Sequence, residues 1–529
     1  MNPRYARWLV IAAAGVAVLV AAAGRRDPEA QSDEPELVLR YLYSTDAEEL
    51  LVPLIDRYNH EPHTHGGRDV RIDGFKLNSG EAEAALVDGD EQAQLWTPAS
   101  SLWGRLLNHE VSSHNWVPDE NRPLGVYSVQ VIAMWKPFAT ALGWPEPIDW
   151  SDILDLATGK RSWADYGHRN FGKFLLGHTN PEISTSGLSA AASDYYAVTG
   201  KQEGLTLADV ERPGVRAAVR KIERSIVHYG ETADELLKEM AFHREGYAHA
   251  VYVQETNLRK LNMTRPKAKQ LVGIRPADGT LVADYPLIVL DAPWVSRNER
   301  VAAQAFARWL VPKITKQAAA KRGFDTVRPT GLAELDPPEP AVLAAIRKAW
   351  QEDRPPANIV LVVDTSGSMS RRLEAAQQGL LSFLGELSEE DEFAVVTSGD
   401  PPGAKIRLVP WKSGSAVTPL YATSGEAPVY PAISRAFDRL HELHESDQIN
   451  AVVVLSDGVG SDVGRQKLLR TIKAESVTEG TNVRIFTVAY AGGENPEVLE
   501  QIAKLSGGRF FTGSPTDLKN VYRKILSYF

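Results

Sequence analysis

The chain has 529 residues, of which 43% are hydrophobic, with a formal net charge of −10 and no cysteine. This length predicts two or three packed domains. The absence of thiols excludes disulfides, cysteine zinc sites, thiol catalysis and attachment through a lipid-modified cysteine. The acidic balance, with no basic stripe, argues against nucleic acid as a partner.

Residues 1–26 have the pattern of an export segment. Arg4 and Arg7 precede an uncharged run of 17 residues, 8–24, and Arg25 and Arg26 follow it. A basic start before an apolar run predicts passage through a membrane. We interpret the segment as a single-pass membrane anchor with the bulk of the chain outside the cytoplasm. The alternative is secretion after cleavage of a signal peptide.

Residues 37–330 follow an acidic tether and alternate short apolar runs with amphipathic stretches. Strands are expected at 37–42, 125–135 and 285–290, and helices at 46–58, 186–196 and 301–310.

Five short segments of this region resemble type II periplasmic solute-binding proteins. They are 42–45, 78–81, 96–101, 177–187 and 284–286. The resemblance implies an α/β domain of two lobes over 37–330, with a cleft that holds a small solute. We expect the chain to cross between the lobes near 127–133 and 250–255.

Small polar residues in these segments are candidate ligand-binding groups. Two of the loops precede Ala-rich helices, whose N-termini present free N–H groups and partial positive charge. Glycine there would let a ligand approach the backbone. Plain helix capping by the same residues is the alternative. The candidate set is Ser44, Thr45, Ser79, Gly80, Ser100, Thr185, Ser186 and Gly187.

Residues 331–356 are rich in proline at both ends around a short helix expected at 341–350. We interpret them as an interdomain linker, because proline-rich stretches act as semi-rigid spacers. Few contacts are then expected between the flanking domains. Proteolysis in the linker should release a stable C-terminal fragment.

Two aliphatic runs beyond the linker each end in a carboxylate. The run 359–363 precedes Asp364, with Ser366 and Ser368 two and four residues later, and the run 451–455 precedes Ser456 and Asp457. Such runs are typical of buried parallel strands, whose carboxyl ends carry ligands. Oxygen groups at this spacing favour a hard divalent cation. The alternative is that Asp364 caps a helix while the serines form turn hydrogen bonds.

These segments resemble the von Willebrand factor A domain and its metal-ion-dependent adhesion site. The resemblance implies a Rossmann-like, doubly wound domain over 357–529. It also implies a Mg²⁺ ion, or Mn²⁺ or Ca²⁺, held by Asp364, Ser366, Ser368 and Asp457, and a protein partner that offers the ion a carboxylate. The family's middle-loop Thr aligns with Ala427, so Thr423 or Ser424 is the candidate fifth ligand; a second, poorer alignment places the middle loop at 418–422 and its Thr at Thr418.

Further strands and helices are expected within 357–529. Strands are expected at 359–363, 392–397, 451–455 and 483–489, and helices at 373–387, 431–443, 465–478, 496–505 and 516–528.

The sequence as a whole indicates an exported, membrane-anchored protein of the cell envelope that binds a ligand or a protein partner. We expect recognition rather than turnover, because the oxygen-only, Ser-rich metal shell has no nearby general base. Three alternatives stay open. The chain would be the receptor of an ABC-type import system, a metal-dependent hydrolase or lyase, or a pair of inert scaffolds in a surface assembly.

Overall fold

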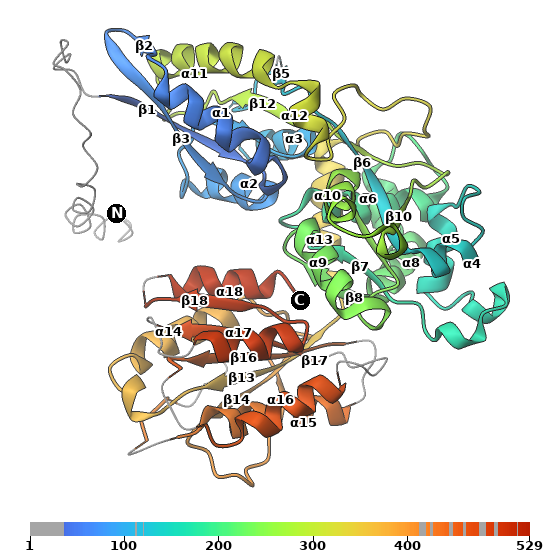
Figure 1. The fold of residues 1–529 in the computed structure, drawn as a ribbon, viewed down its shortest axis with the longest axis vertical. Helices are drawn as coiled ribbons and strands as arrows, with labels where there is room; N and C mark the ends of the chain where they lie inside the picture. Colours follow the sequence, from blue (N-terminus) through green and yellow to red (C-terminus); the bar gives the residue numbers. More distant parts are fainter. Residues whose placement is uncertain are drawn as a thin grey trace.

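The computed structural model describes residues 36–111, 114–119, 121–411, 419–423, 427–443, 448–458, 462–475, 483–490, 496–515 and 517–529. The expected export segment at 1–26 lies outside these residues. Within them, no helix is both long and apolar enough to span a membrane. The described chain forms three α/β units, two lobes followed by a C-terminal domain (Figure 1).

The first lobe is a mixed sheet covered by helices. Its strand order is β2-β3-β1-β4-β12-β5, with β1 parallel to β3 and β4, and β12 antiparallel to β4. The strands are β1 (Leu37–Tyr43), β2 (Thr64–His65), β3 (Arg68–Lys76), β4 (Leu95–Thr97), β5 (Arg122–Pro123) and β12 (Pro286–Val289). The helices are α1 (Glu48–His60), α2 (Ser79–Asp88), α3 (Ser101–Glu110), α11 (Arg297–Leu310) and α12 (Lys316–Ala320).

The second lobe has the strand order β10-β6-β9-β7-β8, and β11 also pairs with β6. Its strands are β6 (Ser128–Trp135), β7 (Leu176–Thr179), β8 (Ile226–Gly230), β9 (Ala250–Gln254), β10 (Leu271–Ile274) and β11 (Val282–Ala283). Its helices are α4 (Lys136–Ala141), α5 (Trp150–Ala157), α6 (Thr185–Thr199), α7 (Leu207–Glu211), α8 (Pro213–Glu223), α9 (Ala233–His243) and α10 (Glu255–Met263).

One of the two expected crossings between the lobes is wrong. The chain enters the second lobe just before β6, at the start of the expected 127–133 stretch, but it returns from β11 to β12 rather than at 250–255. The stretch 250–254 is strand β9, which lies between β6 and β7 inside the second lobe. Its aliphatic residues are buried there, so they belong to a central strand and not to a hinge. A third connection follows at Asp325, which pairs with Tyr127.

The C-terminal domain is a sheet of order β15-β14-β13-β16-β17-β18, parallel except for β15. Its strands are β13 (Ala357–Val363), β14 (Glu392–Thr397), β15 (Val409–Pro410), β16 (Ile449–Ser456), β17 (Val483–Tyr490) and β18 (Phe510–Gly513). Its helices are α14 (Leu373–Leu384), α15 (Val429–Leu443), α16 (Arg465–Glu475), α17 (Pro496–Leu505) and α18 (Leu518–Leu526).

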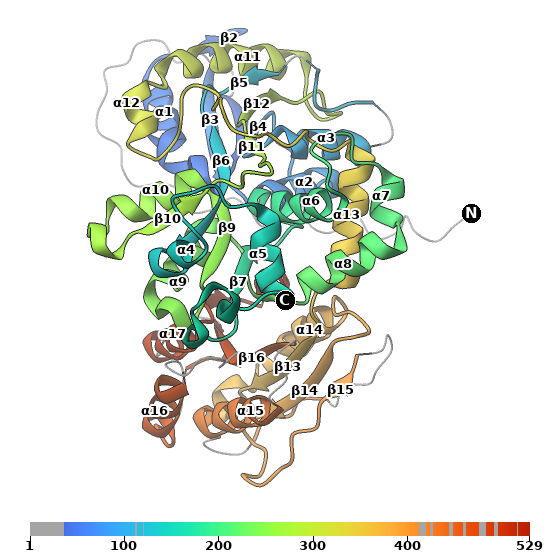
Figure 2. The same ribbon diagram turned by 90° about the vertical axis from the view of Figure 1, so that its right-hand side faces the viewer.

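The expected linker contains helix α13 (Pro340–Asp353), which packs on both lobes. Leu343 joins the hydrophobic cluster of Trp103 in the first lobe, whereas Ile346 and Ala349 join that of Tyr195 in the second. In Figure 2 the helix runs from beside α3 down toward the C-terminal domain. The expectation of a spacer with few contacts is therefore wrong.

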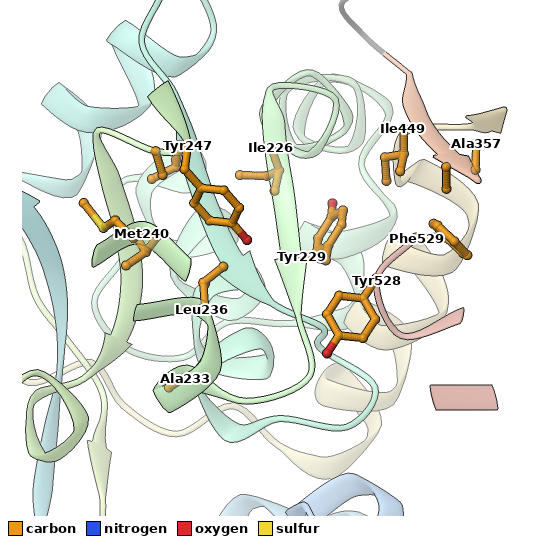
Figure 3. Packing of buried hydrophobic residues seen from close by; sticks show 14 of the residues in the cluster. Ile226, Tyr229, Ala233, Leu236, Met240, Tyr247, Ala357, Ile449, Tyr528 and Phe529 are labelled. Atoms are coloured by element: carbon orange, nitrogen blue, oxygen red, sulfur yellow. The ribbon is translucent and has the colours of Figure 1, made fainter. Parts of the chain in front are cut away.

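The C-terminal domain docks on the second lobe through the starts of its strands and the end of its chain. Ala357, Ile449, Tyr528 and Phe529 share one buried cluster with Ile226, Tyr229 and other residues of the second lobe (Figure 3). Arg484, which is 3% exposed, donates to the carbonyl oxygen of Tyr229 at 3.3 Å and to that of Tyr528 at 2.7 Å. A cluster continuous across the interface makes the two units one packed body.

Candidate functional site

Loops from both lobes meet around a small interlobe cavity that contains most of the candidate ligand-binding residues. Ser44 and Thr45 follow β1, Ser79 begins α2, and Thr185 and Ser186 begin α6. The cavity measures about 10 Å³ and is also lined by Asp46, Asn78, Ser184, Thr232, Ala233 and Gln254. A cavity of this size has room for about one water molecule.

Direct hydrogen bonds between the lobes close this interlobe cavity. The backbone N–H of Gly80 in the first lobe donates to the carbonyl of Ile183 in the second at 2.9 Å. The Thr185 hydroxyl donates to Ser79 Oγ at 3.3 Å and accepts from the Trp103 indole N–H at 2.8 Å. The structure is thus a closed state, in which groups expected to meet a ligand bond to one another.

Two hydroxyls of the cavity stay without a hydrogen-bond partner among the described residues. Ser44 is 2% exposed and Ser186 is fully buried, and neither hydroxyl oxygen has a bond. Buried polar groups in native proteins are nearly always hydrogen-bonded to protein, water or ligand. These two hydroxyls are therefore free to bind a ligand or water atom in the cavity.

The glycines of the candidate set serve contacts within the protein. A Cβ on Gly80 would lie 2.0 Å from the Glu182 carbonyl oxygen, and a Cβ on Gly187 would lie 2.1 Å from that of Thr179. Glycine lets two backbone segments approach closely at both positions. At Gly80 the neighbouring backbone, that of Glu182, belongs to the other lobe. Ser100 lies apart from the cavity and caps α3 by accepting from Leu102 N–H at 3.3 Å.

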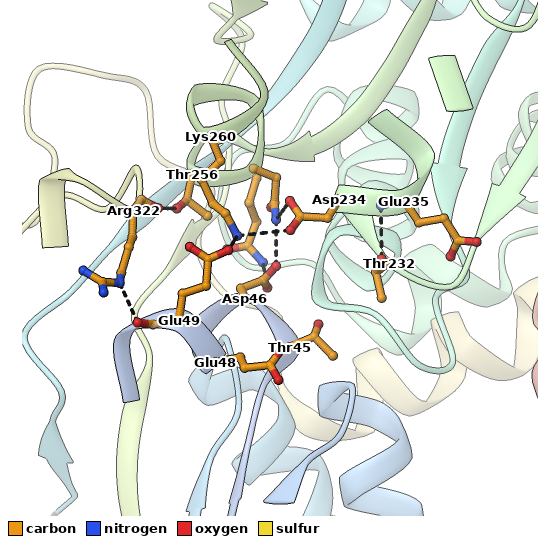
Figure 4. A network of polar contacts seen from close by, with 12 residues as sticks. Thr45, Asp46, Glu48, Glu49, Thr232, Asp234, Glu235, Thr256, Lys260 and Arg322 are labelled. Atoms are coloured by element: carbon orange, nitrogen blue, oxygen red, sulfur yellow. Dashed lines mark hydrogen bonds and ion pairs between the residues drawn. The ribbon is translucent and has the colours of Figure 1, made fainter. Parts of the chain in front are cut away.

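A polar network beside the cavity also joins the lobes (Figure 4). Asp46 of the first lobe accepts from the side chains of Asn257 at 2.8 Å and Gln254 at 3.0 Å. Lys260 of the second lobe pairs with Glu49 and Asp234, each at 3.1 Å. Burial and the nearby charge of Asp234 raise the pKa of Asp46 to about 6. Closure therefore favours protonated Asp46.

The second candidate site lies at the carboxyl ends of β13 and β16. Asp364 is 1% exposed and accepts from the Ser366 N–H at 2.9 Å and from the Ser456 hydroxyl at 2.6 Å. The hydroxyls of Ser366 and Ser368 lie 3.0 Å apart. The first loop thus gathers one carboxylate and two hydroxyls, the oxygen types that Mg²⁺ and Ca²⁺ prefer.

A second carboxylate at this site is paired with an arginine. Asp457 is fully buried, and its Oδ2 accepts from Arg372 Nη1 at 3.0 Å. Burial raises the pKa of Asp364, and the charge of Asp457 adds to the shift. Two buried carboxylates that repel each other fit a divalent cation between them, because its charge would favour both ionised forms.

The middle loop places Thr423 beside the first loop of the site. The Thr423 hydroxyl donates to the Thr365 carbonyl oxygen at 3.0 Å, and its backbone N–H donates to the same oxygen at 2.8 Å. Ala427 is buried and has no side-chain oxygen. Ser424 and Thr418 lie outside the described residues, so Thr423 is the candidate fifth ligand whose position the structure describes.

Comparison with protein-family models finds two matches. The model described as "Bacterial extracellular solute-binding protein" matches residues 39–325, more than half of the chain. The chain belongs to this family. A second model, described as "von Willebrand factor type A domain", matches residues 359–459. The expected α/β architecture, a two-lobed solute-binding domain followed by a von Willebrand factor A (VWA) domain, is thereby confirmed.

Two curated relatives are proteins of Mycobacterium tuberculosis, from strains CDC 1551 and H37Rv. Each is 22% identical to this chain over 297 residues, which is 50% of this chain and 43% of the relative. The alignment covers less than half of each relative's length, so it carries no activity to this chain.

Several solved structures are similar to parts of the chain. A periplasmic thiamin binding protein covers 62% of this chain and 99% of its own length, at 12% identity and a TM-score of 0.42. The periplasmic binding protein AfuA from Actinobacillus pleuropneumoniae covers 60% and 98%, at 13% identity and a TM-score of 0.41. A von Willebrand factor type A protein from Catenulispora acidiphila covers 33% and 42%, at 22% identity and a TM-score of 0.29.

The two edges of the VWA sheet face different surroundings. The starts of β13, β16 and β17 lie against the second lobe of the solute-binding domain, whereas Asp364 and Asp457 follow the opposite ends of β13 and β16. Strands of this length separate the two edges by roughly 23 Å, at about 3.3 Å per residue. The candidate metal site is therefore remote from the docked surface.

Sequence reasoning missed several residues of both sites. Ser398 follows β14 and donates to Asp364 Oδ1 at 3.3 Å. Its place at a third strand end next to β13 was a usable signal. Asn78 lies in the segment 78–81 that carried the resemblance, whereas Arg372 and Gln254 had no such signal, because only the folded chain brings them to the sites. Among the described residues, no three His, Cys, Asp or Glu side chains form a metal cluster, so a metal site there would also need hydroxyl or water oxygens.

Proposed function

We propose that this chain is an extracytoplasmic recognition protein whose VWA domain binds a carboxylate of a protein partner through Mg²⁺, or through Mn²⁺ or Ca²⁺. Asp364, Ser366, Ser368 and Asp457 hold the ion, with Thr423 as a fifth ligand. The solute-binding domain adds a cleft for a small molecule, and residues 1–26 anchor the chain in the membrane or direct its secretion.

The observation that carries the proposal is the pair of buried carboxylates at the free edge of the VWA sheet. Asp364 bonds to the Ser366 N–H and the Ser456 hydroxyl, the Ser366 and Ser368 hydroxyls lie 3.0 Å apart, and Asp457 pairs with Arg372. Mg²⁺ takes six oxygen ligands and keeps water where the protein supplies fewer. A partner carboxylate can replace one such water, and binding through the ion follows from that exchange.

Calorimetric titration of the purified full chain with Mg²⁺ and Mn²⁺ tests this proposal. Asp364→Ala removes one of two charged ligands, and we expect the divalent affinity to fall by about 100-fold or more, since even outer-shell changes cost 10–100-fold. Asp462→Ala is the matched control, because that carboxylate is exposed and pairs with Arg465. Equal affinity in Asp364→Ala and the control would refute the metal site.

A second candidate function is that of an import receptor, which the unpartnered hydroxyls of Ser44 and Ser186 favour. Such a receptor must open, bind its solute and close. Native mass spectrometry of the full chain would detect a small molecule that copurifies, and Ser186→Ala should weaken its retention. A solute that is detected in the wild-type chain but not in Ser186→Ala would favour an import receptor over a protein that recognises only another protein.

A further inference from the structure

Helix α13 is the element that contacts both lobes and then leads into the VWA domain. Leu343 faces the first lobe, where it packs with Trp103, and Val342, Ile346 and Ala349 face the second. Leu343 and Ile346 are fully buried. A helix buried on two sides by two lobes restrains their relative motion, because opening would expose one of its apolar faces to water.

Charged contacts of α13 repeat this division between the lobes. Arg347 pairs with Glu83 of the first lobe at 3.1 Å and with Glu182 of the second at 3.7 Å. Its guanidinium also lies 5.5 Å from the ring centroid of Trp103. Glu83 is 2% exposed. Loss of Arg347 would leave this buried carboxylate unpaired, which is costly.

The last residue of α13 is held on the second lobe by two ion pairs. Asp353 is fully buried and pairs with Arg220 at 2.6 Å and with Arg216. Three residues then lead to β13. In this short joint Arg354 pairs with Asp391 of the VWA domain at 2.7 Å, and the Ala357 N–H donates to the same carboxylate at 2.8 Å. A short, ion-paired segment therefore joins α13 to the VWA domain, and both are fixed to the second lobe.

The end of the VWA domain also contacts the loops that form the interlobe cavity. Asn180, in the loop between β7 and α6, donates to the Ser527 carbonyl oxygen at 3.2 Å. Arg509 pairs at 2.9 Å with Glu231, which directly precedes the cavity residue Thr232. The VWA domain thus touches the closed cleft by a second route.

We propose that α13 is a strap that holds the two lobes shut, so that the cleft admits a ligand only after α13 has released its contacts with the first lobe. The inference goes beyond the proposed function, because it concerns access to the solute-binding cleft and not binding at the metal site. The solute-binding domain is then a controlled site and not a freely opening receptor.

Interlobe distances measured by pulsed electron paramagnetic resonance test the strap. The chain has no cysteine, so Asp56→Cys on α1 and Lys238→Cys on α9 give two unambiguous labels. With the strap intact we expect one short distance population. Arg347→Glu repels Glu83 and Glu182 and should add a longer population. The double variant Arg347→Glu, Glu83→Arg restores an ion pair of opposite sense and should remove it.

Two further variants keep the test decisive. Leu343→Ala removes the apolar contact with the first lobe without altering charge and should also add the longer population. Lys348→Ala is the matched control on the exposed side of α13 and should leave the distances unchanged. The strap is overturned if the labelled wild type already populates both distances, or if folded Arg347→Glu and Leu343→Ala both keep the short one. It is also overturned if Lys348→Ala opens the lobes equally.

Failure of the strap and failure of the proposed function are distinguishable. The distance measurement needs no metal, solute or partner, whereas the calorimetric titration reports the metal site alone. Lobes that open freely in a chain that binds Mg²⁺ would overturn the strap and leave the metal site in place.

Discussion

The interlobe cavity and the edge of the VWA sheet use the same kinds of residue to different ends. Both place Ser and Thr hydroxyls and a buried carboxylate at strand ends and helix starts. In the cleft Ser79, Thr185 and Asp46 are bonded across the two lobes, whereas at the VWA edge the groups converge on one point remote from the docked surface. A motif therefore supplies hydroxyl and carboxylate groups, while the neighbouring domain decides whether they are available.

Removing a buried contact at the docked edge of the VWA sheet should lower the free energy of unfolding more than any other change proposed below. Arg484→Met keeps most of the side-chain volume but leaves the carbonyls of Tyr229 and Tyr528 without their buried donor. We expect a loss of about 3 kcal/mol in the free energy of unfolding, from two unmet acceptors at about 1–3 kcal/mol each. Differential scanning calorimetry should show one wild-type transition shifted to lower temperature in the variant.

Arg470→Ala is the control for Arg484→Met, because Arg470 is exposed on α16. Two independent wild-type transitions, or an isolated 357–529 fragment as stable as the full chain, would contradict the single packed body. Such a result would instead support the loose linker that the prolines suggested.

The titration of Asp46 in the interlobe network predicts a pH dependence of the closed state. Asp46 faces Asn257 and Gln254, with Asp234, Lys260 and Glu49 nearby (Figure 4). Its pKa is raised from 3.8 to about 6, so the closed state binds a proton more tightly than an open or unfolded state. Its contribution therefore favours closure below about pH 4 and is lost as the pH rises through 6.

Asp46→Asn should remove this dependence, because the amide does not titrate in this range. The difference in unfolding free energy between variant and wild type should change by up to about 3 kcal/mol between pH 4 and pH 7, at 1.36 kcal/mol per pKa unit. Denaturant titrations across this range measure it. A difference that stays constant with pH would show that Asp46 is solvated in solution.

The sequence predicted the regular elements well where aliphatic runs are continuous. Strand β14 and helix α17 have the expected bounds, and β13, β16 and β17 differ from theirs by one or two residues. Strand β18 was missed, because its four residues alternate between buried and partly exposed positions without an aliphatic run. Short strands at a sheet edge give a weak pattern.

The contacts between domains could not be predicted in the same way. The prolines around α13 suggested a spacer, but Leu343 and Ile346 are buried by different lobes. A helical pattern of apolar residues shows that a face is buried, not which neighbour buries it. The candidate metal loop was predictable because its residues are adjacent in sequence, whereas Arg372 reaches Asp457 across 85 positions.

Arg372 gives a smaller expected effect at the metal site. Its guanidinium supplies positive charge to Asp457, so it competes with a divalent cation for this carboxylate. We expect Arg372→Ala to tighten Mg²⁺ binding by up to about tenfold, which corresponds to 1.4 kcal/mol. The neighbouring Arg371→Ala is the control, because that side chain is exposed. Weaker binding in Arg372→Ala would mean that the arginine orients Asp457 for the ion instead.

The fifth ligand gives the smallest effect and separates two assignments of the middle loop. Thr423→Val keeps the side-chain shape but removes the oxygen beside Thr365. We expect it to weaken Mg²⁺ binding a few-fold, since a water replaces a neutral ligand and both carboxylates remain. Ala427→Thr would tighten binding if position 427 can supply the missing oxygen. Because Ala427 is buried, tighter binding in Ala427→Thr requires the loop to turn toward the ion. If Ala427→Thr leaves the affinity unchanged and Thr423→Val weakens it, Thr423 is the fifth ligand.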